Sequence, residues 1–324
     1  MDSSWPFVGE AAALLAAFFW AAATLMFGKL GRDLSPVMLN LVKGVFAISF
    51  LALTLVIQTD ISGTLPEIPQ AALLPLLLSG ALGIGLGDTA YFAVINLLGA
   101  RRALLLETLA PPMAAVLAWT FLSEQLSFRS FAGIVITLLG VAWVISERVP
   151  GSTKQITAAG VRVALLATFC QAAGAVLSRA ALAGTEVSPL WSSLLRLFAG
   201  LAFMGVLAWL RPQLLARSQE KSASDRGFAK TADEPRYSVG FNRLRSPRLL
   251  GMVAITSFFA TYLGIWLQQI SLKHTAAGIA QALLATSPLF VLPLAALSGE
   301  GLSRRAVFGV VVALSGVWLL LFSG

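Results

Sequence analysis

The chain has 324 residues, of which 57% are hydrophobic and only 12% are charged, and its mean hydropathy is +0.83. Soluble globular proteins carry about 25% charged residues, so this composition excludes an ordinary soluble fold. The formal net charge of +8 does not indicate a nucleic-acid partner, because the basic residues fall between apolar segments. One cysteine and one histidine exclude a disulfide framework and a metal site built from these residues, and we expect no cofactor.

Ten apolar segments follow one another along the chain, each long enough to cross a hydrocarbon core of about 30 Å as a helix. They are too long and too uniformly apolar for barrel strands, and a helix satisfies every backbone amide within its own segment. Pro111, Pro112 and Pro288 remove backbone donors within two segments, which predicts free carbonyls that act as local acceptors or hinge points there. The predicted spans are residues 8–28, 35–57, 72–98, 103–122, 128–146, 160–181, 188–210, 249–271, 276–297 and 303–323.

The second half of the chain repeats the first. Lys43 corresponds to Arg196 at an offset of 153 residues, and Trp20 corresponds to Gln171 at an offset of 151. Identical residues recur at an offset of 176 near the end of each half. These pairs are Pro112 and Pro288, Glu124 and Glu300, Leu126 and Leu302, Ser127 and Ser303, Arg129 and Arg305, Gly133 and Gly309, and Gly140 and Gly316.

Residues 8–146 therefore form one predicted repeat of five helices, and residues 160–323 form the other. Because five is an odd number, the second half enters the membrane in the opposite direction. The expected fold is all-α: a polytopic membrane protein with ten transmembrane helices in two inverted five-helix repeats. Repeats of this kind build transporters, in which two similar halves move around a central site.

The basic residues predict the orientation of the chain. Eighteen of them follow odd-numbered spans, whereas only Arg129, Arg179 and Lys273 follow even-numbered ones. The positive-inside rule places the first group in the cytoplasm and both chain ends outside. Residues 212–248 form a polar loop that we expect to be disordered and cytoplasmic. The sequence of this loop favours a solvated linker, since an arm that binds lipid headgroups or a partner needs a denser basic cluster.

The ten spans in two five-helix halves, and the similar residues that end each half, resemble the EamA-type transporters of the drug/metabolite transporter superfamily. Residues 104–112 with Glu124 are similar to the fourth helix of that family, and residues 286–288 with Glu300 are similar to its ninth. The resemblance covers the chain except for the 212–248 loop. It implies transport of a small solute, and the family's solutes include amino acids, sugars, nucleotide derivatives and drugs. It also implies cytoplasmic chain ends, contrary to the charges, and we retain the orientation that the charges predict.

Ionisable side chains deep within the spans are candidates for function, because each costs at least about 2.5 kcal/mol on insertion scales. Lys43 and Arg196 each lie eight residues into a span, roughly 12 Å deep, where together they would hold a carboxylate or phosphate. Salt bridges from these cations to Asp88 or Glu107 that only fix the helix packing are the structural alternative. Asp88 lies near the middle of its span, and Tyr91 shares its face.

Deep amides and aromatic rings complete the predicted site. An amide in hydrocarbon needs a partner and so faces protein or a wet cavity, and rings beside it suit the wall of a pocket, although a single Trp more often faces lipid or serves packing. The uncharged candidates are Trp20, Gln171, Trp266, Gln268, Gln269 and Gln281. The predicted substrate-binding residues are Lys43, Asp88, Tyr91, Arg196, Trp20, Gln171, Trp266, Gln269 and Gln281, and the candidate coupling carboxylates are Asp88 and Glu107.

These observations predict a secondary transporter that exports small metabolites such as amino acids by alternating access. A multidrug carrier or a sugar- or nucleotide-derivative carrier is the alternative. An intramembrane enzyme acting on lipid-linked substrates is less favoured, because Walker-type and His-Glu-x-x-His motifs are absent and a lone histidine argues against a triad.

The expected partners are a small-molecule solute and the lipid bilayer, without nucleic acid, and a monomer and a homodimer are equally open. We expect a multi-pass protein of the plasma membrane, in a bacterium the inner membrane.

Overall fold

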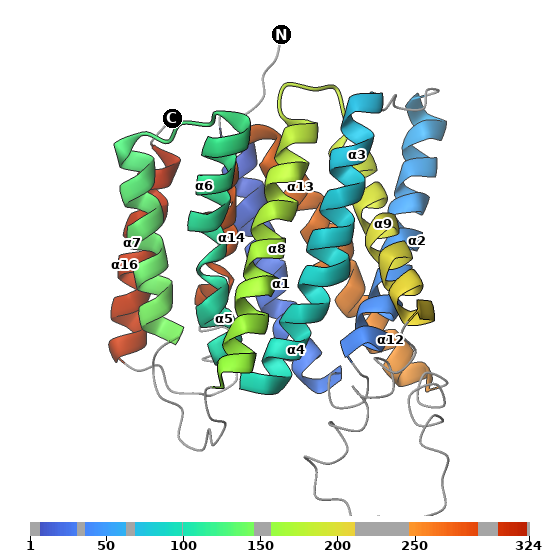
Figure 1. The fold of residues 1–324 in the computed structure, drawn as a ribbon, viewed down its shortest axis with the longest axis horizontal. Coiled ribbons are helices and arrows are strands. Elements are labelled where there is room, and N and C mark those ends of the chain that lie inside the picture. The colour runs from blue at the N-terminus through green and yellow to red at the C-terminus, as the bar shows by residue number, and fades with distance from the viewer. Residues whose placement is uncertain are drawn as a thin grey trace, which may run out of the picture.

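The computed structural model describes residues 7–30, 36–62, 69–98, 100–145, 157–210, 246–290 and 304–322, and all regular secondary structure in these segments is helical. Figure 1 shows them as a bundle of upright helices. Five helices are long and apolar enough to cross a membrane, and five shorter apolar helices accompany them. The all-helical expectation is confirmed, and the number of ten spans stays a prediction. Most of the 212–248 loop and Glu300 lie outside the described residues.

The described helices fall into the two halves that the repeat predicts. The first half contains α1 (Val8–Leu30), α2 (Pro36–Ser62), α3 (Gln70–Ser79), η1 (Gly80–Asp88), α4 (Thr89–Leu98), α5 (Ala100–Glu107), α6 (Ala110–Leu122) and α7 (Phe128–Ile145). The second half contains α8 (Ala158–Leu182), α9 (Pro189–Leu210), α12 (Pro247–Thr256), η2 (Ser257–Leu263), α13 (Gly264–His274), α14 (Ala277–Leu284) and α16 (Arg304–Leu321).

Several helix boundaries follow from local sequence signals. The helices α2 and α9 begin at Pro36 and Pro189. Proline is tolerated there because the N–H groups of a first helical turn have no partner within the helix. Ser188 caps α9, since its hydroxyl accepts a hydrogen bond of 3.3 Å from the Leu190 amide.

Two departures from regular α-helix were not predicted as such. The middle of the third span in each half is π-helical, in η1 and η2. The fourth span, predicted as one helix over 103–122, is divided into α5 and α6 by a turn at Thr108 and Leu109. Pro111 and Pro112 lack the N–H groups that would donate to the carbonyls of Glu107 and Thr108, so the hinge lies where these prolines predict it.

One end of the bundle gathers both described chain ends, as Figure 1 shows. The rings of Phe7 and Phe322 lie 5.9 Å apart, and Arg129 at the start of α7 donates to the Phe322 carbonyl at 3.0 Å. The end of α8 reaches the same place, because Arg179 binds Glu124 in the α6–α7 connection. The helices α1 and α7 therefore start at the end of the bundle where their counterparts α8 and α16 finish.

The helices α7 and α16 pack against each other at one edge of the bundle (Figure 1). Gly140 lies so close to Ala313, and Gly316 to Thr137, that a Cβ at either glycine would overlap its neighbour. Gly133 and Gly140 in α7 are seven residues apart, as are Gly309 and Gly316 in α16, and all four lie at this contact. The spacing places them on one packing face of each helix.

A second seam of small residues joins the halves at the centre. A Cβ at Gly80 in η1 would overlap the backbone of Arg196 in α9, and a Cβ at Gly200 would press on Ile84. The Ser79 hydroxyl hydrogen-bonds to the Gly174 carbonyl of α8 at 2.6 Å. This close approach holds Arg196 beside η1 and fixes where its side chain enters the bundle.

We predict that Gly80→Ala lowers the free energy of unfolding of the detergent-solubilised protein by about 1–3 kcal/mol, because the added methyl meets backbone that cannot move aside. Gly205→Ala in α9 is the matched control, since nothing lies within 4 Å of its Cβ position. That variant should be neutral or stabilising by up to about 1 kcal/mol. Equal melting temperatures for the two variants would contradict the seam.

Candidate functional site

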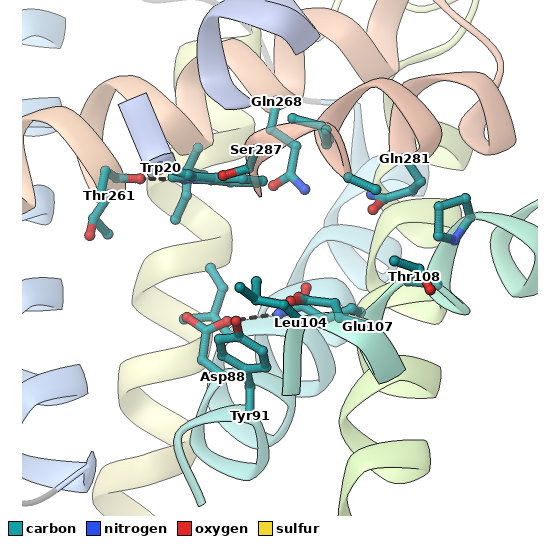
Figure 2. Close-up of a pocket in the computed structure, with 18 of the residues that line it drawn as sticks. Trp20, Asp88, Tyr91, Leu104, Glu107, Thr108, Thr261, Gln268, Gln281 and Ser287 are labelled. Carbon is teal, nitrogen blue, oxygen red and sulfur yellow. Dashed lines mark hydrogen bonds between the residues drawn. The ribbon is translucent and has the colours of Figure 1, made fainter. Parts of the chain in front are cut away.

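A cavity of about 200 Å³ lies between the two halves. The first half contributes residues from α1, α2, η1, α4, α5 and α6, and the second from α8, α9, η2, α13 and α14. Within the described segments, α7 and α16 contribute none. Figure 2 shows Asp88, Tyr91 and Glu107 on one side, facing Gln268 and Gln281 across the cavity.

The structure brings most of the predicted site residues together. Gln269 does not line the cavity, because it is fully buried and accepts a hydrogen bond of 2.8 Å from the Ser192 hydroxyl. Trp266 also lies outside, with its ring 5.9 Å from that of Tyr262. The predicted residues that line the cavity are Trp20, Lys43, Asp88, Tyr91, Gln171, Arg196 and Gln281, together with Glu107.

Residues that the internal repeat pairs meet at this cavity. Lys43 and Arg196 both line it, and so do Trp20 and Gln171. Each pair supplies one member from each half, although 151 or 153 residues separate its members in sequence. The cavity is therefore built from equivalent positions of the two repeats.

The cation of the first half is neutralised by an acid. Lys43 Nζ lies 2.9 Å from Asp88 Oδ2, and Gln171 Nε2 donates to Asp88 Oδ1 at 2.8 Å. Lys43 Nζ also lies 5.0 Å from the centre of the Phe92 ring, within cation–π range. The salt bridge to Asp88 considered from the sequence is thus present, and it lies at the wall of the cavity.

The cation of the second half, Arg196, forms no ion pair in the part of the chain that the structure describes. Arg196 is only 2% exposed, and it takes part in neither of the ion pairs found among the described residues. Its Nη1 donates to Gln268 Oε1 at 3.4 Å, and its buried Nε has no hydrogen-bond partner in the described part of the chain. A guanidinium carries five N–H donors in a planar fork that matches a carboxylate or phosphate. Arg196 is therefore positioned to bind an anionic group.

The repeat explains this asymmetry. At the 176-residue offset, the position equivalent to Asp88 is Gly264. A Cβ at Gly264 would overlap the indole of Trp20, whose Nε1 donates to the Ala260 carbonyl at 2.7 Å. The space that a second acid would need is occupied by a ring of the first half.

A group of polar contacts, here called the end clamp, joins the two halves where the chain ends lie. Arg179 Nε binds Glu124 Oε1 at 2.6 Å, and Arg179 Nη1 donates to the carbonyls of Leu272 and Lys273 at 2.9 and 2.8 Å. Glu124 Oε2 accepts a hydrogen bond of 3.0 Å from the Ala277 amide at the start of α14. The clamp ties the α6–α7 connection of the first half to α8, α13 and α14 of the second.

The profile of the EamA-like transporter family matches residues 7–146 and 158–322. The chain belongs to the EamA-like transporter family. It is thus an integral membrane protein and a transporter of the drug/metabolite transporter superfamily.

A structure titled only "Crystal structure of protein" is similar to this EamA-like chain with a TM-score of 0.67. The alignment covers 96% of this chain and 95% of that one at 14% sequence identity, and this likeness shows the fold alone. A search of curated proteins finds no match.

Several cavity residues of this EamA-like transporter were missed from its sequence. Thr108, Thr261 and Ser287 line the cavity, and so does Gln268, which was noted as a deep amide but not placed in the site. Hydroxyls in membrane helices often bond to their own backbone and carry no strong cost of burial, so they give little signal. A helix-breaking proline within the next four residues is the signal that singles out Thr108, which precedes Pro111 and Pro112, and Ser287, which precedes Pro288.

We predict that Lys43→Met lowers the unfolding free energy by about 3 kcal/mol, because it leaves Asp88 buried without its cation. The double variant Lys43→Met with Asp88→Asn should recover most of this loss, since no charge is then left unpaired. Thermal melting of the purified proteins, followed by tryptophan fluorescence, checks both. A double variant no more stable than Lys43→Met would show that the ion pair contributes little.

Proposed function

We propose that this EamA-like transporter exports a small solute that bears a carboxylate, such as an amino acid, by alternating access. The observation that carries the proposal is Arg196, a buried guanidinium at the central cavity with one long hydrogen bond and no ion pair among the described residues. A carboxylate bound to it in a two-pronged arrangement would satisfy donors that the protein leaves open. The cavity volume of about 200 Å³ favours a small metabolite.

A zwitterion fits the remaining charges. Lys43, Arg196 and Asp88 supply two cations and one carboxylate around the same cavity. The solute carboxylate would bind the guanidinium while its ammonium group competes with Lys43 for Asp88. Binding then exchanges an internal ion pair for contacts with the solute, which keeps the affinity modest and release fast. The solute would thus be recognised and released at the same site.

The proposed movement is a rocking of two inverted five-helix repeats that together form ten spans. It is supported by the opposite directions of α1 and α8 and of α7 and α16 along the bundle. The end clamp joins the halves at only one end of the described bundle, so it must break when the cavity opens there. Neither step requires ATP, and the solute gradient alone supports efflux.

The proposed location is the plasma membrane, in a bacterium the inner membrane, with both chain ends outside and residues 212–248 in the cytoplasm. The end of the bundle that carries Phe7 and Phe322 also carries Arg129, Arg179 and Lys273. These three basic side chains hydrogen-bond to backbone carbonyls of the protein itself. Their engagement within the protein fits an outer face that is otherwise poor in positive charge.

A carrier of sugar phosphates or nucleotide derivatives is the second candidate, because a phosphate suits the Arg196 fork as well as a carboxylate does. A carrier of cationic drugs fits this cavity less well, since a buried guanidinium repels them.

We predict that Arg196→Gln lowers the apparent affinity for solute roughly thirty-fold or more, equivalent to about 2 kcal/mol, because a buried charge partner is lost. Purified protein in liposomes, assayed with labelled amino acids and with sugar phosphates, measures the flux. Arg129→Gln is the matched control, since this arginine is exposed and lies outside the cavity.

Lys43→Met and Asp88→Asn should also lower flux in protein that still reaches the membrane. Near-normal flux in these two variants and in Arg196→Gln would assign all three residues a structural role. Flux of sugar phosphates without flux of amino acids would favour the second candidate.

The orientation has its own test. A single cysteine introduced by Ser222→Cys, in a Cys170→Ser background, should stay unlabelled by an impermeant maleimide in intact cells and react after the membrane is opened. Ready labelling in intact cells would place the loop outside and contradict the orientation that the charges predict.

A further inference from the structure

Glu107 is a second acid at the central cavity, and it takes no part in the Lys43–Asp88 ion pair or the end clamp. It is the last residue of α5 and lines the cavity close to Thr108 and Pro111. The Tyr91 hydroxyl hydrogen-bonds to its carboxylate. On its other side lies a gap too small for a water molecule, lined by side chains such as Ala103 and Ala164. Its carboxylate is therefore reached from the central cavity.

Glu107 is not paired with a cation in the part of the chain that the structure describes. The two ion pairs found there are Lys43 with Asp88 and Arg179 with Glu124. Both oxygens of Asp88 are already engaged, by Lys43 and Gln171. An uncompensated carboxylate at membrane depth is costly, so this position favours a mobile positive charge.

The backbone around Glu107 also favours a bound positive charge. The residue ends α5, where the last carbonyls of a helix carry partial negative charge. Pro111 and Pro112 have no N–H groups to offer the carbonyls of Glu107 and Thr108. A carboxylate and the carbonyls of a broken helix thus meet at one point of the cavity wall, a combination that binds coupling cations in transporters with interrupted helices.

The charged groups that line the same cavity do not form an ion pair with Glu107 in the described structure. Lys43 and Asp88 neutralise each other, Arg196 donates to Gln268 on the opposite side, and Tyr91 adds a hydroxyl. The other titratable side chains on the described helices around α5 lie elsewhere. They are Arg162, exposed near the start of α8; Cys170, packed on Gly87; Arg179, in the end clamp; Arg129, bound to Phe322; and Arg304 and Arg305, exposed at the start of α16.

We propose that Glu107 binds a coupling proton, so that solute export is exchanged for proton entry. This inference rests on the proposed transport function. A proton enters from the outer face, forms an O–H bond on the Glu107 carboxylate and leaves as that bond breaks toward the cytoplasm. The ammonium of a bound zwitterion, held at Asp88 in the same cavity, adds a positive charge near Glu107, so a loaded cavity stabilises Glu107 without its proton. The two positive charges therefore alternate in the cavity, and each lowers the affinity for the other.

The test uses the full-length protein in liposomes with a mixture of labelled proteinogenic amino acids. An acidic interior should drive accumulation by the wild type above the level reached at equal pH. Glu107→Gln should lose this gradient-driven accumulation and show solute exchange that no longer varies with pH. Glu107→Asp should retain part of the coupling. Asp60→Asn, which removes an exposed carboxylate at the end of α2, is the matched control and should behave like the wild type.

Three outcomes would overturn the inference while leaving transport intact. They are wild-type exchange that ignores the pH gradient, a Glu107→Gln variant that still follows it, and accumulation driven by a sodium gradient at equal pH. Loss of exchange in a correctly folded Glu107→Gln variant would make Glu107 a solute-binding residue instead. No wild-type exchange of any amino acid would overturn the transport of amino acids itself, which separates the two failures.

Discussion

Charge buried within a membrane must be paired or hydrogen-bonded, and the two halves of this transporter meet that requirement unequally. Lys43 and Arg196 occupy equivalent positions of the repeat, yet of the two only Lys43 forms an ion pair in the described structure. The position equivalent to Asp88 in the second half is Gly264, and the indole of Trp20 occupies the space that a side chain there would need. Of the two equivalent cations at the cavity, Lys43 is thus paired with Asp88, and Arg196 is positioned to bind an anionic group. The proposed solute chemistry depends on this difference.

Small residues make that arrangement possible. Lipid is as apolar as leucine, so helices in a bilayer associate through close packing and hydrogen bonds. Gly80 lets η1 approach the backbone at Arg196, while Gly140 and Gly316 bring α7 and α16 together outside the cavity. The central helices surround the polar groups, and the outer pair forms a scaffold. Contacts between the halves remain polar and breakable at the end clamp, where Arg179 and Glu124 meet.

Much of the architecture could be predicted from the sequence, because apolar length and internal repetition are strong signals in a membrane protein. The repeat pairs Lys43 with Arg196, and the structure brings both to one cavity. Finer placement could not be predicted. Neighbouring amides differ by about 100° around a helix, and spacing alone did not show that Gln268 faces the cavity while Gln269 bonds to Ser192. The π-helical turns of η1 and η2 change that angle further, and the apolar pattern of their segments does not distinguish them from regular α-helix.

The central claim is that one cavity between the repeats faces each side of the membrane in turn. A cysteine placed there by Ser287→Cys, in a Cys170→Ser background, tests it most directly, because Ser287 lines the cavity next to Pro288. Impermeant maleimide is applied to intact cells and to inverted membrane vesicles. The account predicts labelling from both sides, slowed from both by the transported solute. Labelling from only one side under every condition would contradict alternating access through this cavity.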